Sequence, residues 1–172
     1  MSASFPIEIM KEVKGNSQIF FETGTSEGDT VKTALECGFT EIYSSEIDKA
    51  TWERSRARFV EEKNVAVMLM SSIEALSMIL PNLDLPLMVF LDAHPDCTSG
   101  PSPILEELDL VLKYPGKLVI AADDMRLMGL YRWSASTVEV IIDKILSAGR
   151  RFRINRRENG HRFDDLLVAQ EE

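Results

Sequence analysis

Short apolar runs alternate with helix-patterned segments along most of the chain. Five of these runs have the length and composition of strands: 18–22, 41–46, 65–70, 87–92 and 118–123. Three of them are almost continuously apolar, as strands covered on both faces are. The segments between them space their apolar residues at helical intervals, and a first helix is predicted over 7–13. This alternation predicts an α/β fold with a parallel sheet and helices on both faces.

The pattern changes after residue 150, where two segments alternate polar and apolar residues. Residues 151–157 and 162–168 are predicted strands, and Asn159 with Gly160 between them suits a type I′ turn. An antiparallel hairpin added to five parallel strands predicts a three-layer, Rossmann-like fold with a seven-stranded mixed sheet. Because the chain has 172 residues and no linker or repeat, residues 1–172 are expected to form one domain.

Charge and composition narrow the classes of function. The net charge of −9 disfavours nucleic acid as a partner, since non-specific binding to phosphates depends on Lys and Arg. The one basic cluster, within 150–157, alternates with apolar residues and indicates the solvated face of a strand. The sequence has neither a membrane-length apolar run nor a signal-peptide pattern, and its two cysteines match no metal-ligand spacing. A cytoplasmic protein without a membrane partner is therefore expected.

A glycine loop follows the first predicted strand, in the segment ETGTSEG over 22–28. In an open α/β sheet, ligands bind at the carboxyl ends of the strands, near the point where the strand order reverses. A P-loop would need a lysine after Gly28, and a dinucleotide fingerprint would need a third glycine beside Gly24 and Gly28. A P-loop and a dinucleotide-binding loop are therefore both disfavoured interpretations of this segment.

The next two strands end in polar residues. Glu46 lies 22 positions after Gly24, a spacing that allows an acidic side chain to accept hydrogen bonds from ribose hydroxyls. The third strand leads into Ser71 and Ser72. Ser71 with Glu74 also forms a capping-box pattern for the following helix, so a ligand contact and a helix cap are both open at this position.

Carboxylates end the fourth and fifth predicted strands, at Asp92, Asp123 and Asp124. Because like charges repel, their clustering suggests that a cationic ligand group or a metal binds there. His94 follows Asp92 by two positions, where a neutral imidazole could take a proton from a hydroxyl. A hydrogen-bonding role within the loop is the alternative for His94.

The glycine loop, Glu46 and the strand-end acids resemble class I S-adenosylmethionine-dependent methyltransferases over residues 22–124. The resemblance implies S-adenosylmethionine as cofactor. It implies that the methionine end is held by Glu22, Gly24, Thr25 and Gly28, the ribose by Glu46, the adenine by Ser72 and the amino group by Asp92. Family members often have an acidic residue where this chain has Ser71. Glu106 and Glu107 match the family pattern, and the solvated first turn of a helix explains them equally well.

The strand-end acids also resemble those of catechol O-methyltransferase and related magnesium-dependent enzymes. This resemblance implies Mg²⁺ bound by Asp92, Asp123 and Asp124, and methyl transfer to the oxygen of a small molecule. The catechol enzymes have a lysine at the place of Pro95, so His94 and Asp92 are the predicted catalytic residues here.

Segments 94–100 and 125–133 are expected to border the methyl acceptor. An inactive binding or regulatory protein that keeps the cofactor pocket is the alternative function. A homodimer formed through a sheet edge or through segment 125–133 is compatible with the pattern.

Overall fold

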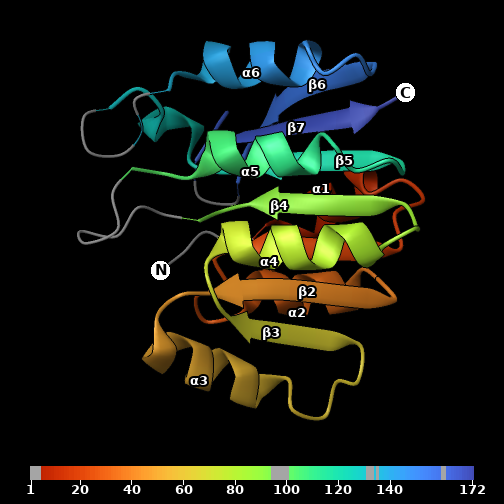
Figure 1. The fold of residues 1–172 in the computed structure, drawn as a ribbon, viewed down its shortest axis with the longest axis vertical. Coiled ribbons are helices and arrows are strands. Elements are labelled where there is room, and N and C mark those ends of the chain that lie inside the picture. Colours follow the sequence, from red (N-terminus) through yellow and green to blue (C-terminus); the bar gives the residue numbers. More distant parts are fainter. Residues whose placement is uncertain (1–4, 94–100, 131–133, 135, 160–161) are drawn as a thin grey trace.

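The computed structural model describes residues 5–93, 101–130, 134, 136–159 and 162–172. Its seven strands form one mixed sheet in the order β3-β2-β1-β4-β5-β7-β6 (Figure 1). The strands are β1 (Ile19–Thr23), β2 (Glu41–Glu46), β3 (Val65–Leu69), β4 (Leu87–Leu91), β5 (Leu118–Ala122), β6 (Phe152–Arg157) and β7 (Leu166–Glu171). Strands β1 to β5 are parallel, and β7 pairs antiparallel with both β5 and β6. The predicted α/β fold is confirmed.

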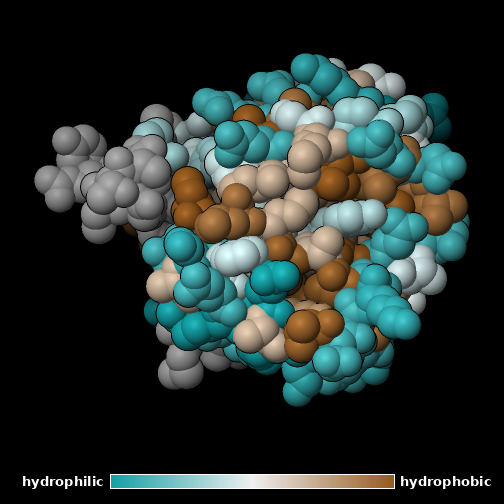
Figure 2. Space-filling view, turned by 60° about the horizontal axis from the view of Figure 1, so that its bottom comes forward, coloured by the Kyte–Doolittle hydropathy of each residue, from teal (hydrophilic) through white to brown (hydrophobic). Residues whose placement is uncertain are grey.

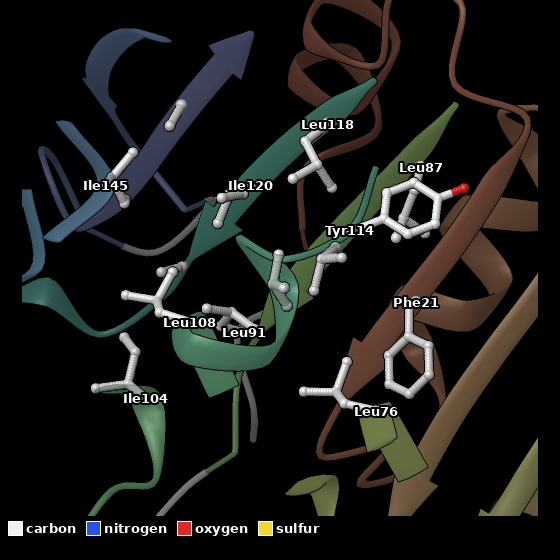
Figure 3. Close-up of a cluster of buried hydrophobic side chains, with 14 of the residues drawn as sticks. Phe21, Leu76, Leu87, Leu91, Ile104, Leu108, Tyr114, Leu118, Ile120 and Ile145 are labelled. Atoms are coloured by element: carbon white, nitrogen blue, oxygen red, sulfur yellow. The ribbon is translucent and has the colours of Figure 1, made fainter. Parts of the chain in front are cut away.

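Helices cover both faces of the sheet and give the fold its three layers. They are α1 (Ile7–Val13), α2 (Asp29–Glu36), α3 (Lys49–Arg58), α4 (Ser72–Ile79), α5 (Ile104–Val111) and α6 (Val138–Leu146). Helices α4, α5 and α6 pack on one face, in a cluster that includes Phe21, Leu76, Leu108 and Ile145 (Figure 3). Helices α1 and α2 pack on the other face, where Phe20 of β1 lies. Successive residues of β1 thus point into two different cores, as the pleat of a strand requires.

The strand order reverses between β1 and β4. The chain runs outward from β1 through β2 to β3 and then crosses back to β4, on the other side of β1. Thr23, the last residue of β1, pairs with Ser45 of β2 and with Leu91 of β4. The loops that follow these three strands therefore meet at one edge of the sheet, where ligands of open α/β folds bind.

The predicted hairpin is correct in direction and wrong in its turn. Strand β7 begins at Leu166 instead of residue 162, so β6 and β7 are not joined by a two-residue turn. Asn159 is buried, at 2% exposure, and its side-chain amide donates to Asp123 and Asp165. A residue whose side chain is held by two buried carboxylates cannot serve as the exposed corner of a two-residue turn. Gly160, the other residue of the predicted turn, lies outside the described residues.

The outer surface carries both polar and apolar residues. Figure 2 shows hydrophobic residues among hydrophilic ones on the side where α4 and the edge strand β3 lie. The Trp52 indole donates to the carbonyl of Val67 at 2.9 Å, which satisfies an acceptor of that edge strand. Among the described helices, none combines the length and the apolar character needed to cross a membrane.

Candidate functional site

Backbone hydrogen bonds fasten the glycine loop after β1 to the end of β2. The amides of Gly24 and Thr25 both donate to the carbonyl of Ser45, at 3.0 and 2.9 Å. The amide of Ser26 donates to Glu46 Oε2 at 2.9 Å. A phosphate-binding loop would present such amides to its ligand. Because these three amides are bonded within the protein, the geometry argues against a pyrophosphate at this loop.

Both glycines of the loop are required by packing. Gly24 has a φ of +88°, and a Cβ there would lie 2.6 Å from the carbonyl oxygen of Asp92. Gly28 has a φ of +81°, and a Cβ there would lie 2.6 Å from the ring of Phe59. The loop is therefore wedged between the end of β4 and the residue that follows α3. The predicted contact of these glycines with a cofactor stays a prediction.

Glu46 ends β2 with both carboxylate oxygens bonded to backbone amides. Oε2 accepts from Ser26 and Oε1 accepts from Asp48, each at 2.9 Å. Each oxygen keeps a second lone pair, so the carboxylate can accept further hydrogen bonds from two hydroxyl groups. The next residue, Ile47, is 59% exposed and offers an apolar surface beside the carboxylate, which sequence reasoning did not single out. This geometry is compatible with the predicted ribose contact.

Glu22 is buried beneath the same loop. The Ser44 hydroxyl donates to Glu22 Oε2 at 2.8 Å and shares a 2.6 Å hydrogen bond with the hydroxyl of Thr25. Burial raises the pKa of Glu22 to about 8, against the opposing effect of hydrogen bonds from Ser44 and Thr30. Glu22 and Thr25 thus belong to a buried network that joins β1, β2 and α2. Their predicted contact with the methionine end of the cofactor stays a prediction.

A pocket lies between the carboxyl ends of β4 and β5 and the start of α5. Its described lining comprises Leu91, Asp92, Ala93, Ser102, Ile104, Glu107, Asp123, Asp124 and Met128. Four of these residues are acidic, and none of the described lining residues is basic. Met128 comes from the segment expected to border the acceptor, whereas residues 94–100 and 131–133 lie outside the described residues. The pocket is therefore both acidic and partly apolar.

Asp92 connects this pocket with the glycine loop. Its backbone amide donates to the carbonyl of Thr23 at 3.2 Å and to the Thr23 hydroxyl at 3.1 Å. Burial and, next, the negative charge of Asp123 raise the pKa of Asp92 well above its usual range. A carboxylate in this position is stabilised by any positive charge that enters the pocket.

Glu107 corrects the expectation of a solvated acidic first turn. Glu106 is exposed as expected, but Glu107 is 1% exposed and lines the pocket. Burial raises the pKa of Glu107 to about 7, although hydrogen bonds from Ser72 and Thr23 oppose the rise. Sequence reasoning named Glu107 and left its role open between the family pattern and a solvated first turn. Helical spacing was the available signal, because position 107 falls on the buried stripe of 104, 108 and 111.

The acidic cluster that the structure assembles differs from the predicted magnesium ligands. Carboxylate oxygens of Asp123, Asp124 and Asp165 lie within 4.8 Å of one another. Asp92 does not belong to this group. Asp165, which sequence reasoning missed, comes from the connection between β6 and β7 and is 1% exposed. The last two strands thus bring a third acid to the end of β5.

Side chains of the protein already bind this acidic cluster. The Arg126 guanidinium donates to Asp124 at 2.5 Å and also to Asp165. The Asn159 amide donates to Asp123 at 2.8 Å and to Asp165 at 3.1 Å. Because an arginine lies where a cation would be bound, Mg²⁺ would fit this cluster only if Arg126 moved. The donor set therefore does not support the predicted magnesium site.

The remaining predicted residues lie at the edges of the site. The capping box of Ser71 and Glu74 is confirmed, with Ser71 as the N-cap of α4. Ser72 begins α4 and is buried, with its hydroxyl hydrogen-bonded to Glu107, so its predicted adenine contact stays a prediction. His94 lies outside the described residues, and its predicted catalytic role stays a prediction as well.

Comparison with solved structures identifies the class of fold. The sheet order, with its antiparallel last pair, is the fold of class I S-adenosylmethionine-dependent methyltransferases, as the sequence resemblance implied. No family model and no curated protein sequence matches the chain. The fold likeness therefore stands without a match between sequences.

Three solved structures illustrate the likeness. A putative O-methyltransferase from Klebsiella pneumoniae is 14% identical with a TM-score of 0.67, over 96% of this chain and 78% of that chain. The O-methyltransferase TomG from Streptomyces achromogenes, solved with S-adenosylmethionine, is 17% identical with a TM-score of 0.66, over 96% and 77%. An rRNA methylase from Streptococcus thermophilus is 12% identical with a TM-score of 0.59, over 96% and 93%. At these identities the likeness shows the fold, and the acceptors differ between the neighbours.

Proposed function

We propose that this protein is an S-adenosylmethionine-dependent methyltransferase that acts on a small molecule. The observation that carries the proposal is the hydrogen bond between Glu46 and the glycine loop, at the edge where the strand order reverses. This hydrogen bond places the Glu46 carboxylate, an acceptor for ribose hydroxyls, beside the glycine loop. The amides of Gly24, Thr25 and Ser26 in that loop already donate within the protein and are not available to a phosphate. The fold shared with TomG, which was solved with S-adenosylmethionine, supports the same cofactor.

The residues at this edge match the parts of the cofactor. Glu46 would accept hydrogen bonds from the ribose, and the exposed apolar surface of Ile47 would lie against the adenine. The amino group and the sulfonium are positively charged, and buried acids such as Asp92 and Glu22 favour positive charge nearby. The cofactor, when bound, supplies a methyl group on a positively charged sulfur.

The protein's main task in such a transfer is to hold the acceptor in line and keep water out. The pocket beyond Asp92 suits this task, since Leu91, Ile104 and Met128 give it apolar walls. Asp92 and His94 are our proposed catalytic residues, and an oxygen atom is our proposed methyl acceptor. The acidic pocket and the net charge of −9 favour a small molecule over RNA, although an rRNA methylase shares the fold. A cytoplasmic location and a homodimer stay predictions.

The test is isothermal titration calorimetry with S-adenosylmethionine, S-adenosylhomocysteine and NAD. We expect the wild-type protein to bind both sulfur ligands and not NAD. Glu46→Gln should weaken binding roughly 10- to 100-fold, because hydrogen bonds to a charged group contribute about 1.5–3 kcal/mol. Glu41→Gln is the matched control, since Glu41 begins β2 and so lies at the opposite end of the strand from Glu46.

The same titrations distinguish the alternatives. Absence of binding of either sulfur ligand by folded wild-type protein would reject the cofactor. Binding without turnover of any acceptor would favour the inactive binding protein. Repeating the titrations with Mg²⁺ tests the magnesium hypothesis, and we expect no change because Arg126 already contacts the acidic cluster.

A further inference from the structure

One buried oxygen of a residue that lines the pocket has no hydrogen-bond partner among the described residues. It is Oε1 of Glu107, a residue that is 1% exposed and lines the pocket. The hydroxyls of Ser72 and Thr23 form hydrogen bonds with the carboxyl group of Glu107, but Oε1 still has no partner among the described residues. Leaving a buried carboxylate oxygen unsatisfied costs free energy, so a donor is expected to reach it when the site is filled.

The charges around the pocket indicate what that donor carries. Arg126 offsets Asp124, and the Asn159 amide bonds to Asp123. For Glu107, no described Lys, Arg or His forms an ion pair, and no basic residue is among the described lining. A positively charged donor would therefore be favoured over a neutral hydroxyl.

A metal ion is a poorer match to this position. Among the described residues, the acids whose oxygens are close enough to share an ion are Asp123, Asp124 and Asp165. Neither Glu107 nor Asp92 belongs to that group. A ligand that satisfies Glu107 needs to bring its own hydrogen atoms, as an ammonium group does with up to three N–H donors.

We propose that Glu107, together with Asp92, forms a binding site for an ammonium group in this pocket. The proposal rests on the proposed function, which offers two sources of that group. One is the amino group at the methionine end of the cofactor, and the other is an amine of the methyl acceptor. Both sources present the same chemistry to the two carboxyl groups.

Calorimetry with two sulfur ligands separates the sources. S-adenosylhomocysteine carries the ammonium group, whereas 5′-methylthioadenosine shares its adenine, ribose and sulfur and lacks the amino-acid end. If the cofactor supplies the ammonium, Glu107→Gln should weaken S-adenosylhomocysteine at least 10-fold and leave 5′-methylthioadenosine unchanged. The control is Glu106→Gln, on the exposed side of the same helix, which should leave both affinities unchanged.

The second arm uses protein saturated with S-adenosylhomocysteine and three ligands of similar size: benzylamine, benzyl alcohol and benzoate. If the acceptor supplies the ammonium, the wild-type protein should bind benzylamine in preference to the other two. Glu107→Gln should then lose that binding at least 10-fold, with both nucleoside affinities unchanged.

Three results would overturn the proposal. They are unchanged affinities in both arms, equal weakening of both sulfur ligands, and a wild-type preference for benzyl alcohol or benzoate without an effect on S-adenosylhomocysteine. Failure of the wild-type protein to bind either sulfur ligand would instead reject the proposed function. Circular dichroism checks that the variants are folded, and Glu107→Asp, which keeps the charge but withdraws it, serves if the glutamine variant does not fold.

Discussion

The acidic side chains at the carboxyl ends of the strands have different surroundings in two halves of the site, the β1–β2 half and the β4–β5 half. At the ends of β1 and β2, the protein itself supplies the donors: a hydroxyl donates to Glu22, and backbone amides donate to Glu46. At the end of β4 and the start of α5, Asp92 and Glu107 lie near other acids, and one oxygen of Glu107 has no described partner. The acids of the first half are therefore held by donors of the protein itself, whereas those of the second half favour a positive charge nearby.

Under the proposed function, this difference would let one sheet edge bind two kinds of ligand group. An acid that is already hydrogen-bonded is fixed in place and offers its remaining lone pairs to neutral hydroxyls. A crowded, buried acid binds a cation strongly because the cation relieves both repulsion and burial. The β1–β2 half therefore suits a sugar, and the β4–β5 half suits an ammonium group.

The largest effect that tests this comparison is the dependence of stability on pH. Burial raises the pKa of Glu22 to about 8, of Glu107 to about 7 and of Asp123 to about 6. The folded chain then holds more protons than the unfolded chain between about pH 5 and 8. The free energy of unfolding should fall as pH rises through this window. The expected fall is on the order of 1 kcal/mol for each unit by which folding raises the pKa of one of these groups.

Urea unfolding at pH 5.5, 6.5 and 7.5 measures this slope. Glu22→Gln and Glu107→Gln should each flatten it, one variant from each half, while the exposed Glu106→Gln should not. Acids with a lowered pKa, such as Glu171, titrate below this window and do not mask the effect. A stability that rises between pH 5.5 and 7.5 would contradict the prediction.

A smaller loss in the free energy of unfolding is expected from Gly24→Ala, which lies at the contact between the two halves. The left-handed backbone costs about 1–2 kcal/mol with a side chain, and the overlap with the Asp92 carbonyl adds about 1–3 kcal/mol. Gly38→Ala is the matched control, because Gly38 has a φ of +75° and no atom within 4 Å of the added Cβ. Urea unfolding should show the larger loss for Gly24→Ala, and equal losses would mean that the close contact is unimportant.

The smallest of these effects is expected from Asn159→Ala. The substitution removes a donor shared by two buried acids of the β5 end and should destabilise the fold by about 1.5–3 kcal/mol. Asn82→Ala is the control, since the Asn82 amide donates to one exposed backbone carbonyl. A loss no greater than that of Asn82→Ala would show that the acids of this half need no neutral donor.

The parallel part of the fold could be predicted because its strands are buried on both faces. Every residue of β1, β4 and β5 is buried, and such strands are recognisable from their apolar runs alone. The start of β7 could not be predicted, since Asn159 and Gly160 have the composition of a tight turn. The partner that decides the matter, Asp123, lies 36 residues away in the sequence.

The candidate site could be predicted where it follows from strand ends. Glu46 and Asp92 lie at one sheet edge because parallel strands end together. Glu107 could not be placed by the same reasoning, because an acid in the first turn of a helix is ordinarily solvated and favourable there. The contact of Arg126 with Asp165 depends on the path of the β6–β7 connection, which no local pattern indicates.

The position of β7 between β5 and β6 has a consequence for synthesis on the ribosome. Strand β6 is made before β7 but joins the sheet only through it. Until β7 has emerged, β5 is an open edge and Phe152 of β6 has no neighbouring strand to pair with. An unpaired edge is a template for association with other chains. The edge of β5 is therefore open to such association until β7 pairs with it.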